Sequence, residues 1–180
     1  MDPKDELITH LPAMRAFAMS LTRNSATADD LVQDAVVKAW SNFHSFEAGT
    51  NMRAWLFTIL RNTYYSLHRK RRREVEDPEG VMAGQLSVKP SHDGTMAMRD
   101  FEAAFSQLND EQREALTLVG AEGFSYEEAA EMCGCAVGTI KSRTNRARKR
   151  LAELMQMEEN ESLDFTDKAT LSVMSGKPAA

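Results

Sequence analysis

Apolar residues recur at every third or fourth position along most of this chain, and no segment alternates apolar and polar residues. A spacing of three and four places side chains on one face of an α-helix, whereas a half-buried strand needs a period of two. The periodic segments cover approximately residues 7–21, 28–43, 52–73, 97–108, 110–119, 126–133 and 137–155. We therefore predict an all-α fold built from these helices.

Turn and capping residues mark the ends of the predicted helices. Thr27 is the expected N-cap of the second helix, and Pro12 either kinks the first helix or begins a fresh first turn. Residues 109–112 and 125–128 have the pattern of a capping box, which satisfies two backbone amides at a helix start. Gly134 supplies a turn between the last two helices, so these helices have the length and punctuation of a helix-turn-helix.

The helical period is lost between residues 74 and 95, where glycine, proline and aspartate accumulate. We expect a flexible linker there, so the chain divides into two small helical domains that move relative to each other. The expected boundaries are a first domain at 1–75, a linker at 76–96, a second domain at 97–155 and a disordered tail at 156–180.

Basic residues are concentrated in two short windows of an otherwise acidic chain. The 180 residues carry a formal net charge of −5, which taken alone argues against a nucleic-acid partner. Residues 61–73 and 141–150, however, hold 12 of the 22 lysines and arginines and no acid, which leaves 10 bases against 27 acids elsewhere. Two cationic faces on an acidic body are typical of a protein that binds nucleic acid at two places.

The last predicted helix indicates how the second window would meet DNA. At about 100° per residue, its buried stripe consists of Ile140, Thr144, Ala147 and Leu151. The opposite face carries groups that suit base edges in a major groove, namely Gly138, Thr139, Ser142, Asn145, Arg146 and Lys149. The flanks carry cations that suit phosphates, namely Lys141, Arg143, Arg148 and Arg150. The alternative is a solvated helix face, although such a face usually mixes both signs of charge.

The first window lies beside an aromatic set formed by Trp55, Phe57, Tyr64 and Tyr65. Unpaired bases stack on aromatic side chains while cations hold the backbone, so this combination favours binding of single-stranded DNA. Two alternatives stay open: the cations are the solvated end of a helix and complement its dipole, and Trp55 packs in the core.

Several classes of function find no support in the sequence. Cys133 and Cys135 are too close for good disulfide geometry and the four histidines are scattered, so we expect no zinc site and assign the thiols no chemistry. No catalytic triad or phosphate loop is found, so we expect no enzyme activity and no cofactor. Without a long apolar run or a signal peptide, we expect a soluble cytoplasmic monomer that does not bind membranes.

Four motifs together resemble the extracytoplasmic-function sigma factors, a group within the sigma-70 family. They are Asp29-Asp30-Leu31-Val32-Gln33-Asp34, Ala39-Trp40, Arg53-Ala54-Trp55-Leu56 and Val137-Gly138-Thr139-Ile140-Lys141-Ser142-Arg143. They stand in the family's order, and the resemblance covers about residues 7–155. The stretch 46–56 is most similar to the subgroup that governs the general stress response (EcfG-like).

The resemblance implies a sigma factor that directs RNA polymerase to stress-response promoters. It implies that the first domain is region 2, which binds the clamp helices of the polymerase largest subunit and captures the minus-10 element as it opens. The second domain would be region 4, which reads the minus-35 element, and the polymerase flap is a further expected contact. A small anti-sigma factor of the NepR type, bound to both domains, is the expected inhibitor.

The resemblance also assigns site residues by position. Those expected to bind core polymerase are Asp29, Asp30, Gln33 and Asp34. Those expected to bind the minus-10 element are His44, Phe46, Asn51, Arg61, Asn62, Tyr65, Arg69 and Arg72. Those expected to bind the minus-35 element are Thr139, Lys141, Ser142, Arg143, Asn145, Arg146, Arg148 and Lys149.

Two other functions stay open on the sequence alone. A stand-alone helix-turn-helix regulator would contact DNA only through residues 97–155, yet the first domain has a cationic window of its own. A sigma-like decoy would bind an anti-sigma factor and no DNA, yet the chain has no room for the receiver domain that such proteins usually carry.

Overall fold

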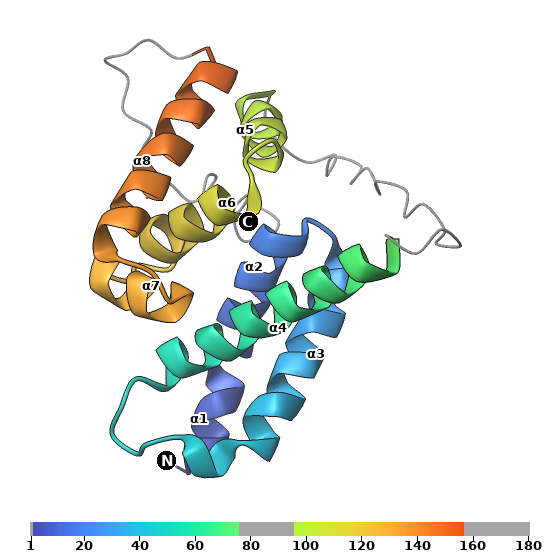
Figure 1. The fold of residues 1–180 in the computed structure, drawn as a ribbon, viewed down its shortest axis with the longest axis vertical. Helices are drawn as coiled ribbons and strands as arrows, with labels where there is room; N and C mark the ends of the chain where they lie inside the picture. The colour runs from blue at the N-terminus through green and yellow to red at the C-terminus, as the bar shows by residue number, and fades with distance from the viewer. Residues whose placement is uncertain (1, 76–95, 157–180) are drawn as a thin grey trace.

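The computed structural model describes residues 2–75 and 96–156, and every regular element in these ranges is helical (Figure 1). The helices are α1 (Pro3–Thr9), α2 (Leu11–Thr22), α3 (Ser25–Ser41), α4 (Met52–Val75), α5 (Met96–Ser106), α6 (Asp110–Leu116), α7 (Tyr126–Cys133) and α8 (Val137–Leu154), with short turns η1 (Phe43–Ser45) and η2 (Thr117–Ala121). The predicted all-α fold is confirmed. The expected linker and tail fall almost entirely on 76–95 and 157–180, which lie outside the described residues.

The first predicted helix is divided at His10 into α1 and α2. Pro12 stands in the first turn of α2, where its missing amide costs no hydrogen bond, so it begins a fresh helix and does not kink one. The expected N-cap of α3 is wrong: Asn24 caps the helix and its side chain accepts a 2.9 Å hydrogen bond from the backbone amide of Thr27. Both residues are capping types, and the one that lies three positions earlier satisfies the first turn.

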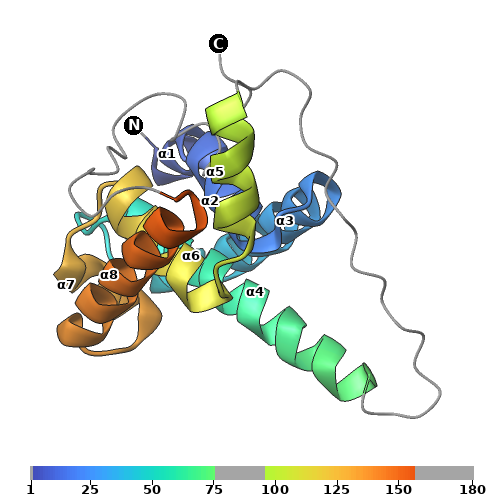
Figure 2. The same cartoon turned by 90° about the horizontal axis from the view of Figure 1, so that it is seen from above.

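Helices α1 to α4 form an N-terminal group around one apolar core. Phe17 and Phe57 are both fully buried there and stack with their ring centroids 5.0 Å apart. Phe57 therefore cannot stack on bases, and its inclusion in the aromatic set for single-stranded DNA was wrong. The C-terminal half of α4 extends beyond the bundle (Figure 2), so residues 66–75 are exposed along with their cations.

Helices α5 to α8 form a C-terminal group whose ends follow the predicted signals. Capping boxes are present at Asn109 and Ser125, and Gly134 ends α7 in a left-handed conformation with φ of 63°. Helix α8 follows directly from this turn, which gives the helix-turn-helix arrangement of α7 and α8. None of the helices in the described part of the chain is long and apolar enough to span a bilayer.

The two groups pack against each other, with α2 and α4 facing α6 and α7 (Figure 1). One apolar cluster runs through both groups, and in it the ring of Phe57 meets the ring of Phe124 edge-on at 5.3 Å. The guanidinium of Arg53 lies 4.4 Å from the centroid of Phe124. The two halves that the sequence separates are thus in direct contact in this structure.

Candidate nucleic-acid interface

Helix α8 is buried on one side and open on the other. The predicted stripe is confirmed in full, because Ile140, Thr144, Ala147 and Leu151 are each 0% exposed. The opposite face exposes Asn145, Arg146 and Lys149, three of the residues expected to read the minus-35 element. A helix docked by its apolar stripe in this way presents its polar face to a major groove.

Neighbouring helices hold the flanks of the α8 face. Arg143 forms an ion pair with Glu111 of α6 at 3.3 Å, and the ammonium of Lys141 lies 5.6 Å from the ring centroid of Tyr126 in α7. Thr139, Ser142 and Arg148 are half-buried. The expected minus-35 residues therefore form one continuous face, with its centre open and its rim in contact with α6 and α7.

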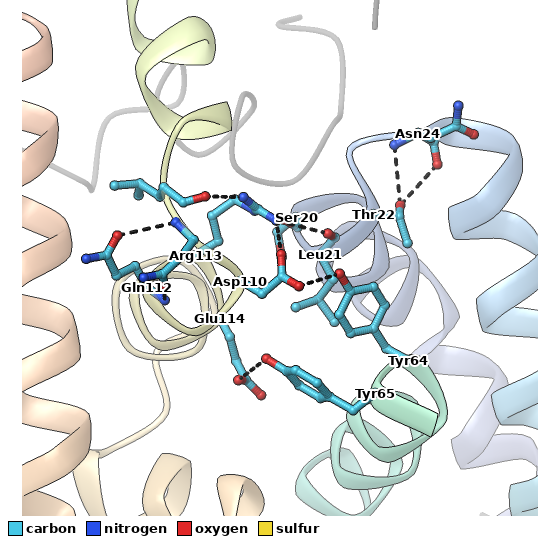
Figure 3. Close-up of polar contacts among 12 residues, drawn as sticks. Ser20, Leu21, Thr22, Asn24, Tyr64, Tyr65, Asp110, Gln112, Arg113 and Glu114 are labelled. Atoms are coloured by element: carbon cyan, nitrogen blue, oxygen red, sulfur yellow. Dashed lines mark hydrogen bonds and ion pairs between the residues drawn. The ribbon is translucent and has the colours of Figure 1, made fainter. Parts of the chain in front are cut away.

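Part of the corresponding face of α4 is covered by side chains of α6. Arg61 forms an ion pair with Glu114, whose side chain is only 1% exposed. The hydroxyl of Tyr65 donates a 2.9 Å hydrogen bond to the same carboxylate (Figure 3). One turn earlier on α6, Asp110 accepts a 2.9 Å hydrogen bond from the hydroxyl of Tyr64 (Figure 3). Two residues expected to bind the minus-10 element, Arg61 and Tyr65, are thus engaged within the protein.

Burial and charge at this contact shift several pKa values. Burial, followed by the nearby carboxylates of Asp110 and Glu114, raises the pKa of both Tyr64 and Tyr65 well above the usual range. Burial is the largest single effect and lowers the pKa of Arg61, but the charge of Glu114, the hydrogen bond to it and the nearby Cys133 and Tyr65 together outweigh burial, so the net shift is upward. Arg61 is thus held as a cation and both tyrosines as neutral hydrogen-bond donors.

The thiol of Cys133 lies against the same carboxylate. Burial, followed by the charge of Glu114, raises the pKa of Cys133 to about 12. A thiol with this pKa is almost entirely protonated near neutral pH and is a poor nucleophile.

Arg113 fixes α6 in place on the N-terminal group. Its side chain donates hydrogen bonds to the backbone carbonyls of Ser20 at 3.1 Å and Leu21 at 3.4 Å, at the end of α2 (Figure 3). The same guanidinium contacts Asp110 and the carbonyl of Leu108. A buried arginine with these partners ties the start of α6 to the N-terminal group.

The loop between η1 and α4 brings together only part of the expected minus-10 set. Phe46 is half-buried and packs on Trp55 with ring centroids 5.1 Å apart, which supports the alternative that Trp55 has a packing role. The side chain of Asn51 accepts a 3.1 Å hydrogen bond from the amide of Ala54 and so caps α4. His44 is exposed. Phe46 and Asn51 line a hollow of 590 Å³ with α7, and His44 is outside its lining.

A second hollow, of 320 Å³, lies between α3 and α4 and contains residues that the sequence analysis missed. Of the expected minus-10 set only Asn62 lines it; the other polar lining residues are Lys38, Asn42, Ser45, Thr63 and Ser66. The ammonium of Lys38 donates a 3.3 Å hydrogen bond to Thr63. A helical spacing of four between Lys38 and Asn42, and between Asn62 and Ser66, is the signal that could have found this site. Arg69 and Arg72 lie beyond it, on the exposed end of α4.

The residues expected to bind core polymerase lie on one exposed face of α3. Asp30, Gln33 and Asp34 are exposed, while Asp29 is exposed but forms a 2.7 Å ion pair with Arg15 of α2. Asp30, Gln33 and Asp34 are therefore available to a partner, whereas Asp29 is already paired with a residue of α2.

Comparison with known proteins decides the family. Residues 7–74 match the Sigma-70 region 2 family and residues 98–151 match the Sigma-70, region 4 family. The chain is 50% identical over 173 residues to the ECF RNA polymerase sigma factor EcfG of Rhodopseudomonas palustris (strain TIE-1), covering 96% of this chain and 94% of that one. This chain belongs to the extracytoplasmic-function sigma factors of the sigma-70 family.

Two solved structures have the same fold as this chain. The sigma factor RpoE in complex with the anti-sigma factor NepR from Bartonella quintana has 53% sequence identity and a TM-score of 0.77, and the match covers 88% of this chain and 99% of that one. CnrH in complex with the cytosolic domain of CnrY has 25% identity and a TM-score of 0.57, covering 85% and 86%. The N-terminal and C-terminal groups are therefore the region-2 and region-4 domains of a sigma factor.

Proposed function

We propose that this sigma factor directs RNA polymerase to stress-response promoters by placing α8 in the major groove of the minus-35 element and by capturing the minus-10 strand on α4. The observation that carries the proposal is the acid-free face of α8, which stands open opposite a fully buried stripe. Asn145, Arg146 and Lys149 at its centre would contact base edges. Thr139, Lys141, Ser142, Arg143 and Arg148 would contact the rim of the groove and phosphates.

The minus-10 strand would be held by the cations of α4 and by the loop before it. Arg61, Arg69 and Arg72 supply charge along the helix, and the loop supplies Phe46 and Asn51. Asn62, which lines the 320 Å³ hollow, and Tyr65 are the residues of α4 suited to an unstacked base. His44 is an exposed side chain of the loop before α4.

Polymerase would dock on the exposed face of α3 formed by Asp30, Gln33 and Asp34, with Asp29 at its edge. Clamp helices that bind such a face would offer basic side chains. The domain boundaries that fit this division are residues 1–75 and 97–155. As an initiation factor the chain would work as a monomer beside the polymerase in the cytoplasm, and it would perform no covalent chemistry of its own.

We further propose that a small anti-sigma factor of the NepR type inhibits this chain. Support comes from the Bartonella quintana RpoE, which is 53% identical and was solved in complex with NepR. An inhibitor bound to both domains would keep α3 from polymerase and α8 from DNA.

The experiment that tests the function is run-off transcription with purified core polymerase, this protein and a pool of promoter fragments. Specific start sites that appear only when the protein is added would support the proposal and would define both promoter elements. Transcripts that are the same with and without the protein would refute it.

Docking on polymerase is tested with the double variant Asp30→Asn, Asp34→Asn. It should lose binding to core polymerase while its circular dichroism spectrum stays that of the wild type. The matched control is Asp5→Asn with Asp100→Asn, which removes the same charge from exposed positions on α1 and α5. Equal binding by the two double variants would show that the α3 face is not the docking site.

A further inference from the structure

The face of α4 that is proposed to hold the minus-10 strand is occupied by the chain's own acidic side chains. Glu114 sits on Arg61 with its carboxylate almost completely buried, and the side chain of Arg61 is only 18% exposed. Tyr65 donates its hydroxyl to the same carboxylate at 2.9 Å. A phosphate could not reach either side chain without displacing Glu114.

The acids of α6 are arranged in register with the donors of α4. Asp110 and Glu114 are one helical turn apart, so they lie on the same face of α6, and each accepts a hydroxyl hydrogen bond from a tyrosine of α4 (Figure 3). Carboxylate and phosphate oxygens are both anionic acceptors that arginine and hydroxyl donors bind in the same manner. The α6 face thus offers α4 the same chemistry as a DNA backbone.

The loop that precedes α4 is covered in the same way by acids of the region-4 domain. Glu122 forms a 2.5 Å ion pair with Arg53 at the start of α4. The 590 Å³ hollow at Phe46 and Asn51 is closed on its other side by α7, which contributes Glu128 and Glu131 to the lining. Acidic residues of one domain therefore face both parts of the proposed minus-10 site.

The centre of the α8 face has no such cover, and only Arg143 at its rim pairs with an acid of α6. Asn145, Arg146 and Lys149 are exposed although they belong to a window as basic as that of α4. Acidic side chains of the region-4 domain therefore pair with cations of α4 and leave the cations at the centre of the α8 face exposed.

We propose that the closed arrangement is a self-inhibited state in which Asp110, Glu114 and Glu122 hold the positions of promoter phosphates on the minus-10 site. This inference rests on the proposed function, since it takes α4 and its loop as the site of strand capture. In the closed state region 4 can still meet a duplex through α8, whereas the part of the region-2 site formed by Arg61 and Tyr65 is closed to a single strand. Capture of the minus-10 strand requires the two domains to separate.

Opening the closed contact exposes apolar surface and separates ion pairs. It combines the apolar cluster that runs through both domains, in which Phe57 meets Phe124, with the hydrogen bonds of Arg113 to the end of α2 and with ion pairs whose charges regain hydration when the domains part. Contacts between domains of one chain generally resemble transient interfaces. A strand that binds only the open state has its apparent affinity reduced by the fraction of molecules that are open.

Binding of DNA by the free protein tests the competition. The probes are a fluorescent single strand with the minus-10 sequence and a fluorescent minus-35 duplex, both defined by run-off transcription. Glu114→Gln keeps the shape of the side chain and removes its charge, and Asp110→Asn with Glu114→Gln removes both acids of the α6 face. We expect these variants to bind the strand about tenfold more tightly than the wild type, because a neutral side chain competes less well than a carboxylate with the DNA phosphates for Arg61 and Tyr65. Binding of the duplex should stay unchanged.

The matched control is Glu111→Gln, which removes the same charge from the same helix. The Glu111 side chain is 58% exposed and pairs with Arg143 of α8, not with α4. It should leave strand binding at the wild-type level. Strand affinity that is unchanged in Glu114→Gln, or raised equally in Glu111→Gln, would overturn the self-inhibition.

A charge swap tests whether these contacts hold the domains closed. Glu122→Arg should repel Arg53 and increase the radius of gyration measured by small-angle X-ray scattering, and Arg53→Glu in the same chain should restore the compact form. Scattering is the readout here because an added arginine would itself attract DNA. A single variant as compact as the wild type would contradict the proposal.

The two proposals fail in different ways. If wild-type protein and core polymerase give promoter-specific transcripts but Glu114→Gln leaves strand binding unchanged, only the self-inhibition is wrong. If the wild type gives no such transcripts and no variant binds the strand, the proposed function is wrong and the self-inhibition falls with it.

Discussion

The two cationic faces of this sigma factor differ in what covers them. On α8, the residues that would read DNA stand opposite a stripe that is buried in their own domain, so the face is open whatever the other domain does. On α4, Arg61 and Tyr65 lie where the two domains meet and are bound to Glu114. Recognition of duplex DNA therefore needs only the region-4 domain, whereas capture of a single strand depends on how the two domains are arranged.

The largest expected difference between the faces is in stability. Arg61→Ala would leave Glu114 buried without a cation, so the free energy of unfolding should fall by about 3 kcal/mol. Arg146→Ala removes an exposed side chain of α8 and should change it by less than about 0.5 kcal/mol. Urea denaturation of the two variants measures the difference.

A double variant serves as the control for this loss of stability. Arg61→Ala with Glu114→Gln should recover most of the loss, because the uncompensated charge is gone. If Arg61→Ala is no more destabilising than Arg146→Ala, the ion pair is not held in solution and the contrast between the two faces disappears.

The next effect concerns sequence reading by the open face. Arg146→Ala should weaken transcription in a way that depends on the minus-35 sequence, with a loss of about 1–3 kcal/mol at promoters where the side chain contacts a base. Run-off transcription on a panel of minus-35 variants measures it. An equal loss on all promoters would mean that Arg146 contacts only phosphate.

The sequence predicted what is decided within one helix or one turn. The stripe Ile140–Leu151 and the capping boxes at Asn109 and Ser125 depend on helical period and on side-chain to backbone bonds a few residues apart, and both are confirmed. Helical period fails where the helix itself changes. Counted four residues on from the buried Ala115, helical period predicts that Val119 lies in the core, but the π-helical turn η2 shifts the register, so Leu118 is fully buried and Val119 only half-buried.

The contact between domains was not predictable from such local signals. The local sequence does not distinguish Glu114 from an exposed glutamate on a helix. Its burial depends on Arg61, which is 53 positions away in sequence. Phe57 was assigned to base stacking because aromatic type alone does not tell a core ring from a platform. The one sequence signal for Glu114 is its place beside Ala115 and Leu116, on the buried side of α6.

A smaller effect should appear at high pH and only at the covered face. Tyr64 and Tyr65 must be neutral to donate their hydroxyls, and burial followed by the nearby carboxylates raises the pKa of both in the closed state. Because the pKa of each tyrosine is raised in the closed state, the two hydrogen bonds stabilise the closed arrangement fully below about pH 10, the usual tyrosine pKa. The contribution falls progressively above that value and is lost completely only as the pH rises through the raised pKa of the closed state.

Scattering between pH 8 and pH 11, chosen to bracket the usual tyrosine pKa of about 10, measures this opening. The wild type should begin to expand above the usual value, and the variant Tyr64→Phe with Tyr65→Phe should not show this onset. An identical expansion in both proteins would assign it to other groups.

The smallest expected effect runs in the opposite direction, at the rim of the open face. Arg143 is held 3.3 Å from Glu111, and because the Glu111 side chain is 58% exposed the pair is screened by water. Glu111→Gln frees Arg143 for a phosphate and should tighten minus-35 duplex binding by about twofold. Glu114→Gln, three residues further along α6, should not change duplex binding at all. If each variant improves binding of both DNAs, the acids of α6 act through net charge alone, and the distinction between a covered and an open face is lost.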